Sequence, residues 1–286
     1  MTSRALAFMA NDRYLHWAKA FLESVRSKDA NLPLYCIPHV GPIEALCNLR
    51  SVYRFEFFAE GTERLDAFGK RLYPFARGRH RANLRKYVAL NLPVDEIAYF
   101  DIDMVMLVDP ERFFGHVEAG RADFVYFSES PEWVYRAGRL HAARELFPEM
   151  RLISAGAFVT SPRRLSIDDI IGTVENNFAL FRSLRHLNVY DQPVLNFVLH
   201  SLAKRIRHIT ELDPALCGMV SSGNPDLRWV EGKIVNVKLA GEVLAVHWAG
   251  PAKRHIKQLA PGGWPMQRFL EALHLQADER IRSLRQ

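Results

Sequence analysis

The first hundred residues alternate between short apolar segments and longer segments of helical periodicity, and this alternation limits the folds available. Strand-like segments cover residues 4–10, 32–38, 52–58 and 95–103. Apolar side chains recur at helical spacing between the first two of these segments. Residues 62–92 are helical in character and rich in basic residues. The alternation predicts an α/β fold with a mainly parallel central sheet, flanked by helices and open to ligands where its strands end.

The second half of the chain is less regular. Residues 123–128, 151–160 and 243–250 resemble strands, whereas residues 166–184, 191–203 and 264–284 have the spacing of helices. No segment rich in glycine and serine separates the two halves. We therefore expect a single domain over residues 1–286.

Composition excludes several classes of protein. A hydrophobic fraction of 49% with 24% charged residues is enough for a core and argues against disorder. The apolar runs are too short to cross a bilayer, and the N-terminus reads as a strand, not as a signal peptide. Cys36, Cys47 and Cys217 form no metal-binding spacing, so we expect buried free thiols in a reducing, cytoplasmic compartment.

The chain carries a formal net charge of +6. An excess of basic residues suits an anionic partner such as nucleic acid, a phosphorylated metabolite or an acidic membrane surface, but it does not choose among them. Aromatic residues are not clustered among the basic ones, and no nucleic-acid motif is present, so we do not expect a nucleic-acid partner.

Two acids interrupt the apolar stretch EIAYFDIDMVMLVDP. Asp101 and Asp103 lie two residues apart, so their side chains point the same way from the end of the fourth strand. Converging carboxylates repel each other unless a cation or proton joins them, and oxygen ligands suit Mg²⁺ or Mn²⁺. The alternative is a surface turn with two solvated acids, which the flanking apolar runs disfavour.

Two enzyme classes use such a pair. In haloacid-dehalogenase-like phosphatases the nucleophile strand reads DxDx(T/V), which DIDMV matches, and Asp168 with Asp169 imitates their late acidic pair. In glycosyltransferases with the GT-A fold, DxD binds the metal on a nucleotide-sugar diphosphate. About three strand–helix units precede Asp101, whereas a phosphatase nucleophile normally lies on the first strand of its core. Asp168 and Asp169 lie at a probable helix start, where the helix dipole stabilises acidic side chains. The glycosyltransferase hypothesis is therefore preferred, with Asp101 as a phosphatase nucleophile as the alternative.

Five motifs in order resemble the retaining glycosyltransferases of family eight and their nucleotide-diphosphosugar transferase relatives. These are FMANDRYLHWAKAFLESVR, NLRKYVALNLPVDEIAYFDIDMVMLVDPERFF, ISAGAFVTSPRRL, YDQPVLNFVL and VHWAGPAKRH. The resemblance covers most of the chain. It implies a GT-A fold, with a nucleotide-binding half over about residues 1–110 and a half for donor sugar and acceptor over about residues 111–262.

The resemblance also implies a set of site residues. It makes Asp101, Asp103 and His247 the ligands of Mn²⁺ or Mg²⁺. It places Asp191 and Gln192 beneath the anomeric carbon of the donor, where Gln192 would stabilise an oxocarbenium-like transition state. The other residues implied in donor binding are Asn11, Asp12, Arg85, Lys86, Ile102, Ser154, Ala155, Gly156, Gly250 and Lys253.

Several of these residues also have a purely structural interpretation, which for Lys253 is a solvated surface position. Asn11, Asp12 and Asp191 are good helix caps, Arg85 and Lys86 suit a solvated helix face, and His247 suits a core position. Three departures from the family pattern leave the sugar and the retention of configuration open: Ser154 replaces an asparagine, Pro193 an acid, and Arg254–His255 a Pro-Trp pair.

The function expected is metal-dependent transfer of a sugar from a nucleotide sugar, by resemblance a UDP-sugar, to a carbohydrate or lipid-linked acceptor such as a surface polysaccharide or lipopolysaccharide. A non-catalytic nucleotide-sugar-binding protein is a further alternative. The last segment, residues 264–284, is amphipathic. We expect it to pack on the core, with peripheral contact to the inner face of an acidic membrane as the alternative.

Overall fold

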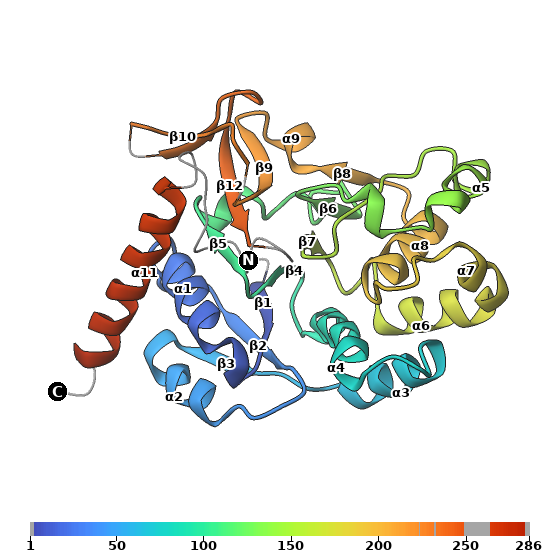
Figure 1. Ribbon diagram of the computed structural model, residues 1–286, viewed down its shortest axis with the longest axis horizontal. Coiled ribbons are helices and arrows are strands. Elements are labelled where there is room, and N and C mark those ends of the chain that lie inside the picture. The colour runs from blue at the N-terminus through green and yellow to red at the C-terminus, as the bar shows by residue number, and fades with distance from the viewer. Residues whose placement is uncertain (1–2, 223, 232, 249–263, 284–286) are drawn as a thin grey trace.

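The computed structural model describes residues 3–222, 224–231, 233–248 and 264–283 (Figure 1). Within them, the first sheet has seven strands in the order β3-β2-β1-β4-β7-β6-β8. Neighbouring strands from β3 to β4 are parallel, β7 runs antiparallel to both β4 and β6, and β8 is parallel to β6. The strand bounds are Arg4–Ala10 (β1), Leu34–Pro38 (β2), Phe55–Phe57 (β3), Glu96–Asp101 (β4), Phe124–Tyr126 (β6), Ala157–Thr160 (β7) and Ile206–His208 (β8).

A second, mostly antiparallel sheet lies beside the first. Its strands follow the order β10-β11-β12-β5, and β9 pairs with β12 in parallel. Their bounds are Met104–Met106 (β5), Leu216–Ser221 (β9), Leu227–Val230 (β10), Lys233–Asn236 (β11) and Gly241–His247 (β12). Because β5 follows β4 after a two-residue turn, the two sheets meet at the DxD segment.

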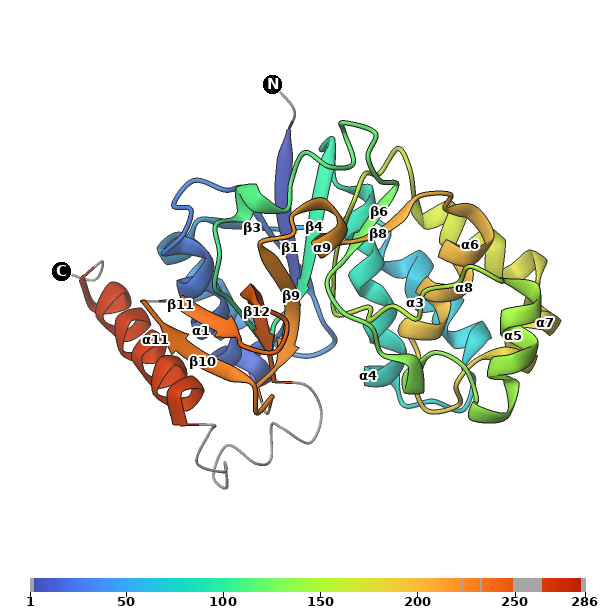
Figure 2. The same cartoon turned by 90° about the horizontal axis from the view of Figure 1, so that it is seen from above.

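Helices cover both faces of the first sheet, and the two views agree in placing α1 and α11 on one side of the molecule and α5 to α8 on the other (Figures 1 and 2). The α-helix bounds are Leu15–Arg26 (α1), Glu44–Tyr53 (α2), Thr62–Leu72 (α3), Gly78–Arg81 (α4), Leu140–Leu146 (α5), Ile167–Asn176 (α6), Phe178–Leu184 (α7), Gln192–Leu202 (α8), Ile209–Leu212 (α9) and Trp264–Ser283 (α11). The 3₁₀ segments are η1 (Asp12–Tyr14), η2 (Ala82–Asn91), η3 (Pro110–Arg112), η4 (Pro131–Trp133) and η5 (Ala137–Arg139).

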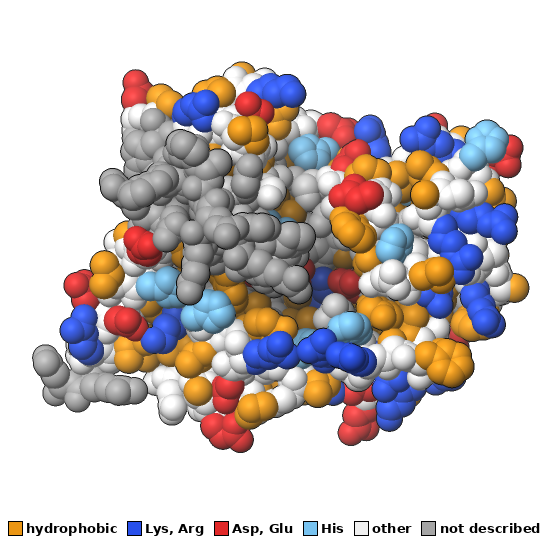
Figure 3. Space-filling model, viewed as in Figure 1, with side chains coloured by type: hydrophobic (Ala, Val, Ile, Leu, Met, Phe, Trp, Pro, Cys, Tyr) orange, Lys and Arg blue, Asp and Glu red, His pale blue; other side chains and the backbone are white. Residues whose placement is uncertain are grey.

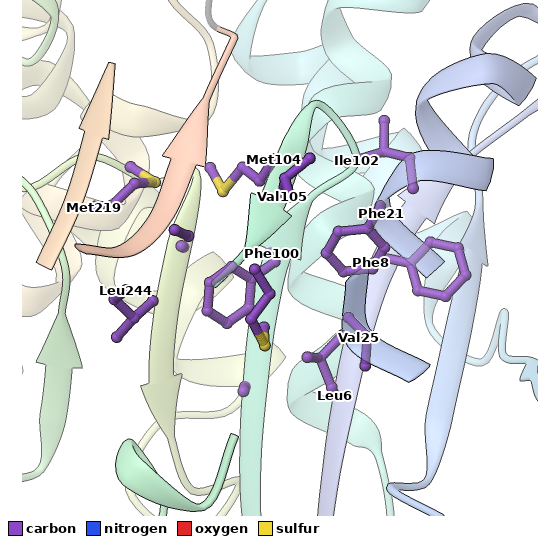
Figure 4. Packing of buried hydrophobic residues seen from close by; sticks show 14 of the residues in the cluster. Leu6, Phe8, Phe21, Val25, Phe100, Ile102, Met104, Val105, Met219 and Leu244 are labelled. Carbon is purple, nitrogen blue, oxygen red and sulfur yellow. The ribbon is translucent and has the colours of Figure 1, made fainter. Parts of the chain in front are cut away.

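The pleat of β1 divides the core in two. Leu6 and Phe8 point into a cluster with Phe21 of α1 (Figure 4), whereas Ala5 and Ala7 face the cluster formed by α3, η2 and α8. Successive side chains of a strand point to opposite faces, so a central strand buried on both sides must be apolar throughout. The uninterrupted apolar run of β1 is this signature, and it confirms the mainly parallel sheet expected from the sequence.

Some expectations needed correction. The strand expected over residues 151–160 begins only at Ala157, and the one expected over 52–58 is limited to Phe55–Phe57. The buried free thiol expected at Cys47 is exposed, because this residue is turned away from Leu46 on the buried face of α2.

The C-terminal helix packs on the protein. Leu270, Leu273 and Ala277 are buried, and α11 lies along α1. The apolar stripe of the expected helix therefore faces the core over these positions, as the packing interpretation requires. No described helix is both long and apolar enough to span a bilayer.

Candidate metal and ligand site

Pairing between β5 and β12 builds the site. The antiparallel register sets His247 opposite Met104, the first residue after the acidic pair. The backbone N–H of Trp248 donates to the carbonyl of Asp103 over 2.9 Å, which fixes the end of β12 against the DxD turn. As a result His247 Nε2 lies 3.4 Å from Asp103 Oδ1.

Asp101, Asp103 and His247 form a group suited to a cation. One ligand atom from each lies within 4.8 Å of the others. Donors about 2.1 Å from a six-coordinate ion are separated from one another by about 3.0 to 4.2 Å, so small side-chain movements suffice to enclose an ion. Two carboxylates with one imidazole are a donor set that Mn²⁺ accepts, and Mg²⁺ suits the carboxylates. The residues present therefore fit a divalent metal.

Gly156 keeps the backbone close to this group. A Cβ atom at this position would lie 2.8 Å from Met104 Cε, 3.2 Å from Asp101 Oδ2 and 3.5 Å from His247 Cε1. Its carbonyl accepts a hydrogen bond of 2.7 Å from the Asp101 N–H. A larger residue would fill the space beside the two ligands, which accounts for glycine here.

Lys86 forms ion pairs with two acids of the site, Asp101 and Asp191. Its side chain is 3% exposed, and Nζ lies 3.1 Å from Asp101 Oδ1, 2.7 Å from Asp191 Oδ2 and 3.1 Å from the carbonyl oxygen of Ala155. Burial alone would lower the pKa of this lysine, but Asp101 and Asp191 outweigh it and raise the pKa. Lys86 is therefore a buried cation that orients two carboxylates, and the solvated helix face considered for it is wrong.

Asp101 has a polar and partly buried environment. Besides Lys86, it accepts a hydrogen bond of 2.9 Å from the hydroxyl of Tyr99. Burial raises the pKa of Asp101 most, Lys86 opposes this, and the negative charges of Asp103 and Asp191 add to the rise. Three acids around one lysine leave an excess of negative charge, which a divalent cation would offset.

Asp191 does not cap its helix as its position suggested. It occupies the N-cap of α8 without a side-chain capping bond, and its carboxylate pairs with Lys86 instead. Gln192, the next residue, donates from Nε2 to the carbonyl oxygen of Ser130 over 3.2 Å. The helix start thus delivers one acid and one amide to the interior of the site.

Two cavities meet at these residues. The smaller, of about 210 Å³, is lined by Met9, Tyr14, His39, Asn83, Lys86, Asp101, Ile102, Asp103 and Asp191. The larger, of about 1020 Å³, includes Ser154, Gln192 and His247 among its lining residues. Figure 3 shows acidic and basic side chains in the central hollow of this face. The metal-binding group lies at the junction, because the smaller cavity takes its two aspartates and the larger takes its histidine.

Other expected site residues serve the framework. Asn11 caps η1 by accepting from the N–H of Arg13, and Asp12 caps α2 by accepting from the N–H groups of Ala45 and Leu46. Arg85 donates to Asp66 and to the carbonyl oxygen of Pro38, which ties η2 to α3 and β2.

Asn11, Asp12 and Arg85 do not line the smaller cavity. Ile102 lines this cavity. Ala155 does not line it, but its carbonyl oxygen accepts a hydrogen bond from Lys86, which does. Gly250 and Lys253 lie outside the described residues.

Asp168 and Asp169 line neither of the two cavities. Ser166 and Asp169 form a reciprocal capping box at the start of α6, and Asp168 pairs with Arg64. This confirms the helix-capping interpretation and removes the second acidic pair on which the phosphatase alternative depended.

Four residues that line the smaller cavity were not predicted from the sequence, namely Met9, Tyr14, His39 and Asn83. Burial lowers the pKa of His39, so its ring is neutral at neutral pH. Tyr14 and His39 follow the first two parallel strands, and Asn83 begins the segment that contains Lys86. The positions of Tyr14 and His39 after strands β1 and β2 were the available signal for these two residues, since parallel strands end at a common edge.

Comparison with known proteins adds structural likeness alone. No family model matches the chain, and neither does any curated protein. The galactosyltransferase LgtC in complex with donor and acceptor sugar analogues has a similar structure, with a TM-score of 0.62 at 15% identity over 94% of this chain and 95% of that one.

Two further solved structures are similar. The glycosyltransferase GlyE of Streptococcus pneumoniae has a TM-score of 0.57 at 12% identity, over 99% of this chain and 63% of that one. Mouse xyloside xylosyltransferase 1 has a TM-score of 0.52 at 12% identity, over 72% of this chain and 84% of that one. Likeness at these identities shows the fold, and it confirms the GT-A glycosyltransferase fold expected from the sequence.

Proposed function

We propose that this chain of GT-A fold is a metal-dependent glycosyltransferase that uses a nucleoside-diphosphate sugar as donor. The observation that carries the proposal is the convergence of Asp101, Asp103 and His247, which come from the two sheets and meet between two cavities. The named activities of the structurally similar proteins, galactosyl and xylosyl transfer among them, support the same class.

Asp101, Asp103 and His247 would hold Mn²⁺ or Mg²⁺, with the imidazole favouring Mn²⁺. When bound, such an ion neutralises charge on the diphosphate leaving group. The family resemblance adds Lys253 as a second positive charge on the diphosphate and Gly250 as a point of close backbone approach. UDP is the nucleotide we propose, on the strength of that resemblance.

The smaller cavity is the proposed nucleotide site. It adjoins Asp101 and Asp103, and Tyr14 and Asn83 offer it an aromatic ring and an amide for a base and a ribose. Asn11 and Asp12 would act on this site indirectly, because their capping bonds fix the turn that precedes α1.

The donor sugar would lie at the junction of the two cavities, between Asp191, Gln192 and Ser154. Lys86 Nζ lies 2.7 Å from Asp191 Oδ2. The Asp191 carboxylate, which would accept hydrogen bonds from sugar hydroxyls, is therefore oriented before the donor binds. Gln192 would stabilise positive charge that develops at the anomeric carbon, and retention of configuration is the outcome we propose.

The larger cavity, at about 1020 Å³, has room for a carbohydrate acceptor. It is lined by acids and aromatic rings, including Glu129, Glu132 and Trp133, and Trp133 is 48% exposed. Sugars are bound by stacking on aromatic rings and by hydrogen bonds to carboxylates, so this lining suits a glycoside.

A screen of nucleotide sugars tests the function. The purified protein, given Mn²⁺ and each donor in turn, should release the nucleotide from one sugar by slow hydrolysis, and a chelator should abolish this release. Gln192→Ala should lower the rate at least about tenfold while nucleotide binding persists. Metal-dependent binding without any turnover would support the non-catalytic alternative and overturn the enzymatic proposal.

A further inference from the structure

The segment that runs from the last turns of α3 through α4 and η2 is rich in positive charge. From Ala67 to Val94 the sequence holds no aspartate or glutamate. Its basic residues, besides His80, are Lys70, Arg71, Arg77, Arg79, Arg81, Arg85 and Lys86. Arg71 pairs with Glu175, Arg85 with Asp66 and Lys86 with two aspartates. The other four have no ion pair with any carboxylate in the described parts of the chain.

An aromatic side chain protrudes from the middle of this segment. Phe75 is 100% exposed, whereas its neighbour Tyr73 is 3% exposed. A single exposed apolar residue is ordinary in a soluble protein. A fully exposed phenylalanine between unpaired cations is a different combination, because it offers an apolar group and positive charge at the same point.

The turn that presents Phe75 is anchored at Tyr73. The hydroxyl of Tyr73 donates to the carbonyl of Tyr190 over 2.7 Å, and Arg185 lies 4.6 Å from the centre of the Tyr73 ring. The N–H of Ala76 donates to the carbonyl of Tyr73 over 3.1 Å. The exposed ring therefore lies two residues after an anchored side chain, within a hydrogen-bonded turn.

This turn lies beside the proposed active site. The ring of His80 lies 5.3 Å from that of Tyr190, which immediately precedes Asp191. Helix α4 continues directly into η2, which carries Asn83 and Lys86 into the smaller cavity. Figure 3 shows basic side chains over α4, at the lower rim of the central hollow. Any partner docked on this turn therefore faces the mouth of the site.

We infer that the turn Tyr73–Arg81 docks on the surface of an anionic lipid bilayer. Arg77, Arg79 and Arg81 complement anionic headgroups, and Phe75 reaches the boundary between headgroups and acyl chains. Soluble polyanions would use the same cations, but they offer no apolar layer for a fully exposed ring. The binding itself does not depend on the proposed function, whereas its use does: a docked enzyme would turn its cavities toward lipid-linked acceptors.

Vesicle sedimentation tests the inference with the full-length chain. The protein should sediment with phosphatidylcholine vesicles that contain phosphatidylglycerol and stay in solution with phosphatidylcholine alone. Raising the salt from about 0.1 M to about 1 M shortens the screening length from about 10 Å to about 3 Å and should release the protein. No sedimentation with the anionic vesicles at low salt overturns the inference.

Variants separate this turn from the general basic charge. Arg77→Gln with Arg79→Gln should weaken binding about twenty-five-fold, since each arginine near the surface contributes about fivefold. Phe75→Ala should weaken it about tenfold. The matched control is Lys28→Gln with Arg54→Gln, which removes the same charge from exposed positions at the ends of α1 and α2. If the control weakens binding as much as the arginine pair, only net charge is at work and the inference is wrong.

A third variant reports the depth of the ring. Phe75→Trp should show fluorescence quenching by vesicles with brominated acyl chains beyond that of the wild type, which has five tryptophans of its own. Sedimentation without this extra quenching would show adsorption by charge alone and overturn the role of Phe75. Circular dichroism of each variant, compared with the wild type, checks that the fold is intact. None of these readouts needs a sugar donor, so they fail independently of the proposed function.

Discussion

At the scale of single residues, the site depends on one missing side chain. Gly156 leaves room for Asp101 and His247, and an added methyl group would meet Asp101 Oδ2 at 3.2 Å. We expect Gly156→Ala to weaken Mn²⁺ binding at least about tenfold, and to lower the free energy of unfolding by about 1–3 kcal/mol through crowding. Titration calorimetry with Mn²⁺ and urea unfolding measure the two effects.

Gly172→Ala is the control for this change, because nothing lies within 4 Å of the added atom and the position is inside α6. It should leave Mn²⁺ binding unchanged and stabilise the fold by up to about 1 kcal/mol. Equal Mn²⁺ affinity in both variants would show that Gly156 does not shape a metal site.

His200 gives the protein a pH dependence away from the site. Its Nε2 lies 2.7 Å from the carbonyl oxygen of Arg151 and must donate to it, so Nδ1 accepts from the hydroxyl of Tyr135 at 2.8 Å. This neutral tautomer is satisfied, and burial lowers the pKa of His200 to about 4 from 6.5. Between these values the unfolded chain binds a proton that the native state does not, so stability falls as the pH drops from about 6.5 to about 4.

Unfolding in urea across this pH range, for the wild type and His200→Gln, measures the effect. The variant should lose less stability on acidification than the wild type, by at most about 3 kcal/mol, because its side chain does not titrate. The comparison isolates this residue from the other histidines with lowered pKa values, such as His39 and His208. Parallel loss of stability in both proteins would contradict the assignment.

At the scale of elements, Lys86 joins η2 to β4 and α8 through Asp101 and Asp191. Removing its charge leaves two facing carboxylates without a counterion, and breaking a buried pair in this way costs about 3 kcal/mol. We expect Lys86→Met to be destabilised by about that amount in urea. Mn²⁺ should recover part of the loss, because Asp101 is one of the proposed metal ligands and a bound cation would offset the charge that Lys86 no longer supplies.

Lys70→Met is the matched control, since Lys70 is exposed at the end of α3 and has no ion pair within the described chain. It should stay within about 0.5 kcal/mol of the wild type. If Lys86→Met is as stable as Lys70→Met, the network is not structural.

A second link between elements holds the C-terminal helix. Arg280 of α11 donates from Nε and from Nη2 to the buried Glu23 of α1, both over 2.8 Å, and Tyr53 adds its hydroxyl at 3.1 Å. Arg280→Ala leaves this carboxylate with one partner in a low-dielectric environment. We expect the free energy of unfolding to fall by about 2 kcal/mol, less than for a fully buried pair because Arg280 is partly exposed.

Arg282→Ala tests whether this loss is specific to the pair. Arg282 lies on the same helix and is exposed, so its removal should change stability by less than about 0.5 kcal/mol. Equal destabilisation by the two substitutions would indicate a loss of helix packing and not of the ion pair.

At the scale of the whole molecule, the sequence predicted what local patterns can encode. The apolar runs of β1 and β4 and the periodicity of α1, α6 and α8 are strong signals, and the structure contains these elements. Strands β8, β9, β10 and β11 were missed. Three of them, β8, β10 and β11, are only three or four residues long and carry exposed residues, whereas the six residues of β9 are interrupted by Gly218. Short, half-polar strands have no periodicity to detect.

The site shows the same division. Asp101 and Asp103 could be predicted as site residues, because they are two acids within an otherwise apolar stretch. His247 was placed by family resemblance alone, since only the register of β12 on β5 brings it to Asp103. Local capping rules misjudged Asp191, because Lys86 from a distant segment competes for its carboxylate more strongly than the helix N-terminus does. Long-range pairing of this kind cannot be read from one sequence.

A metal held at the junction of the two cavities is the centre of the proposed function, and thermal unfolding is the direct test of it. Thermal unfolding of the wild type with saturating UDP and Mn²⁺ should show stabilisation of about 2.7 kcal/mol at a hundredfold excess over Kd. A chelator should reverse it, and Asp103→Ala should abolish it. Asp168→Asn, which changes an acid at the start of α6, should keep it. No stabilisation of the wild type, or the same stabilisation in Asp103→Ala, would contradict the proposed site.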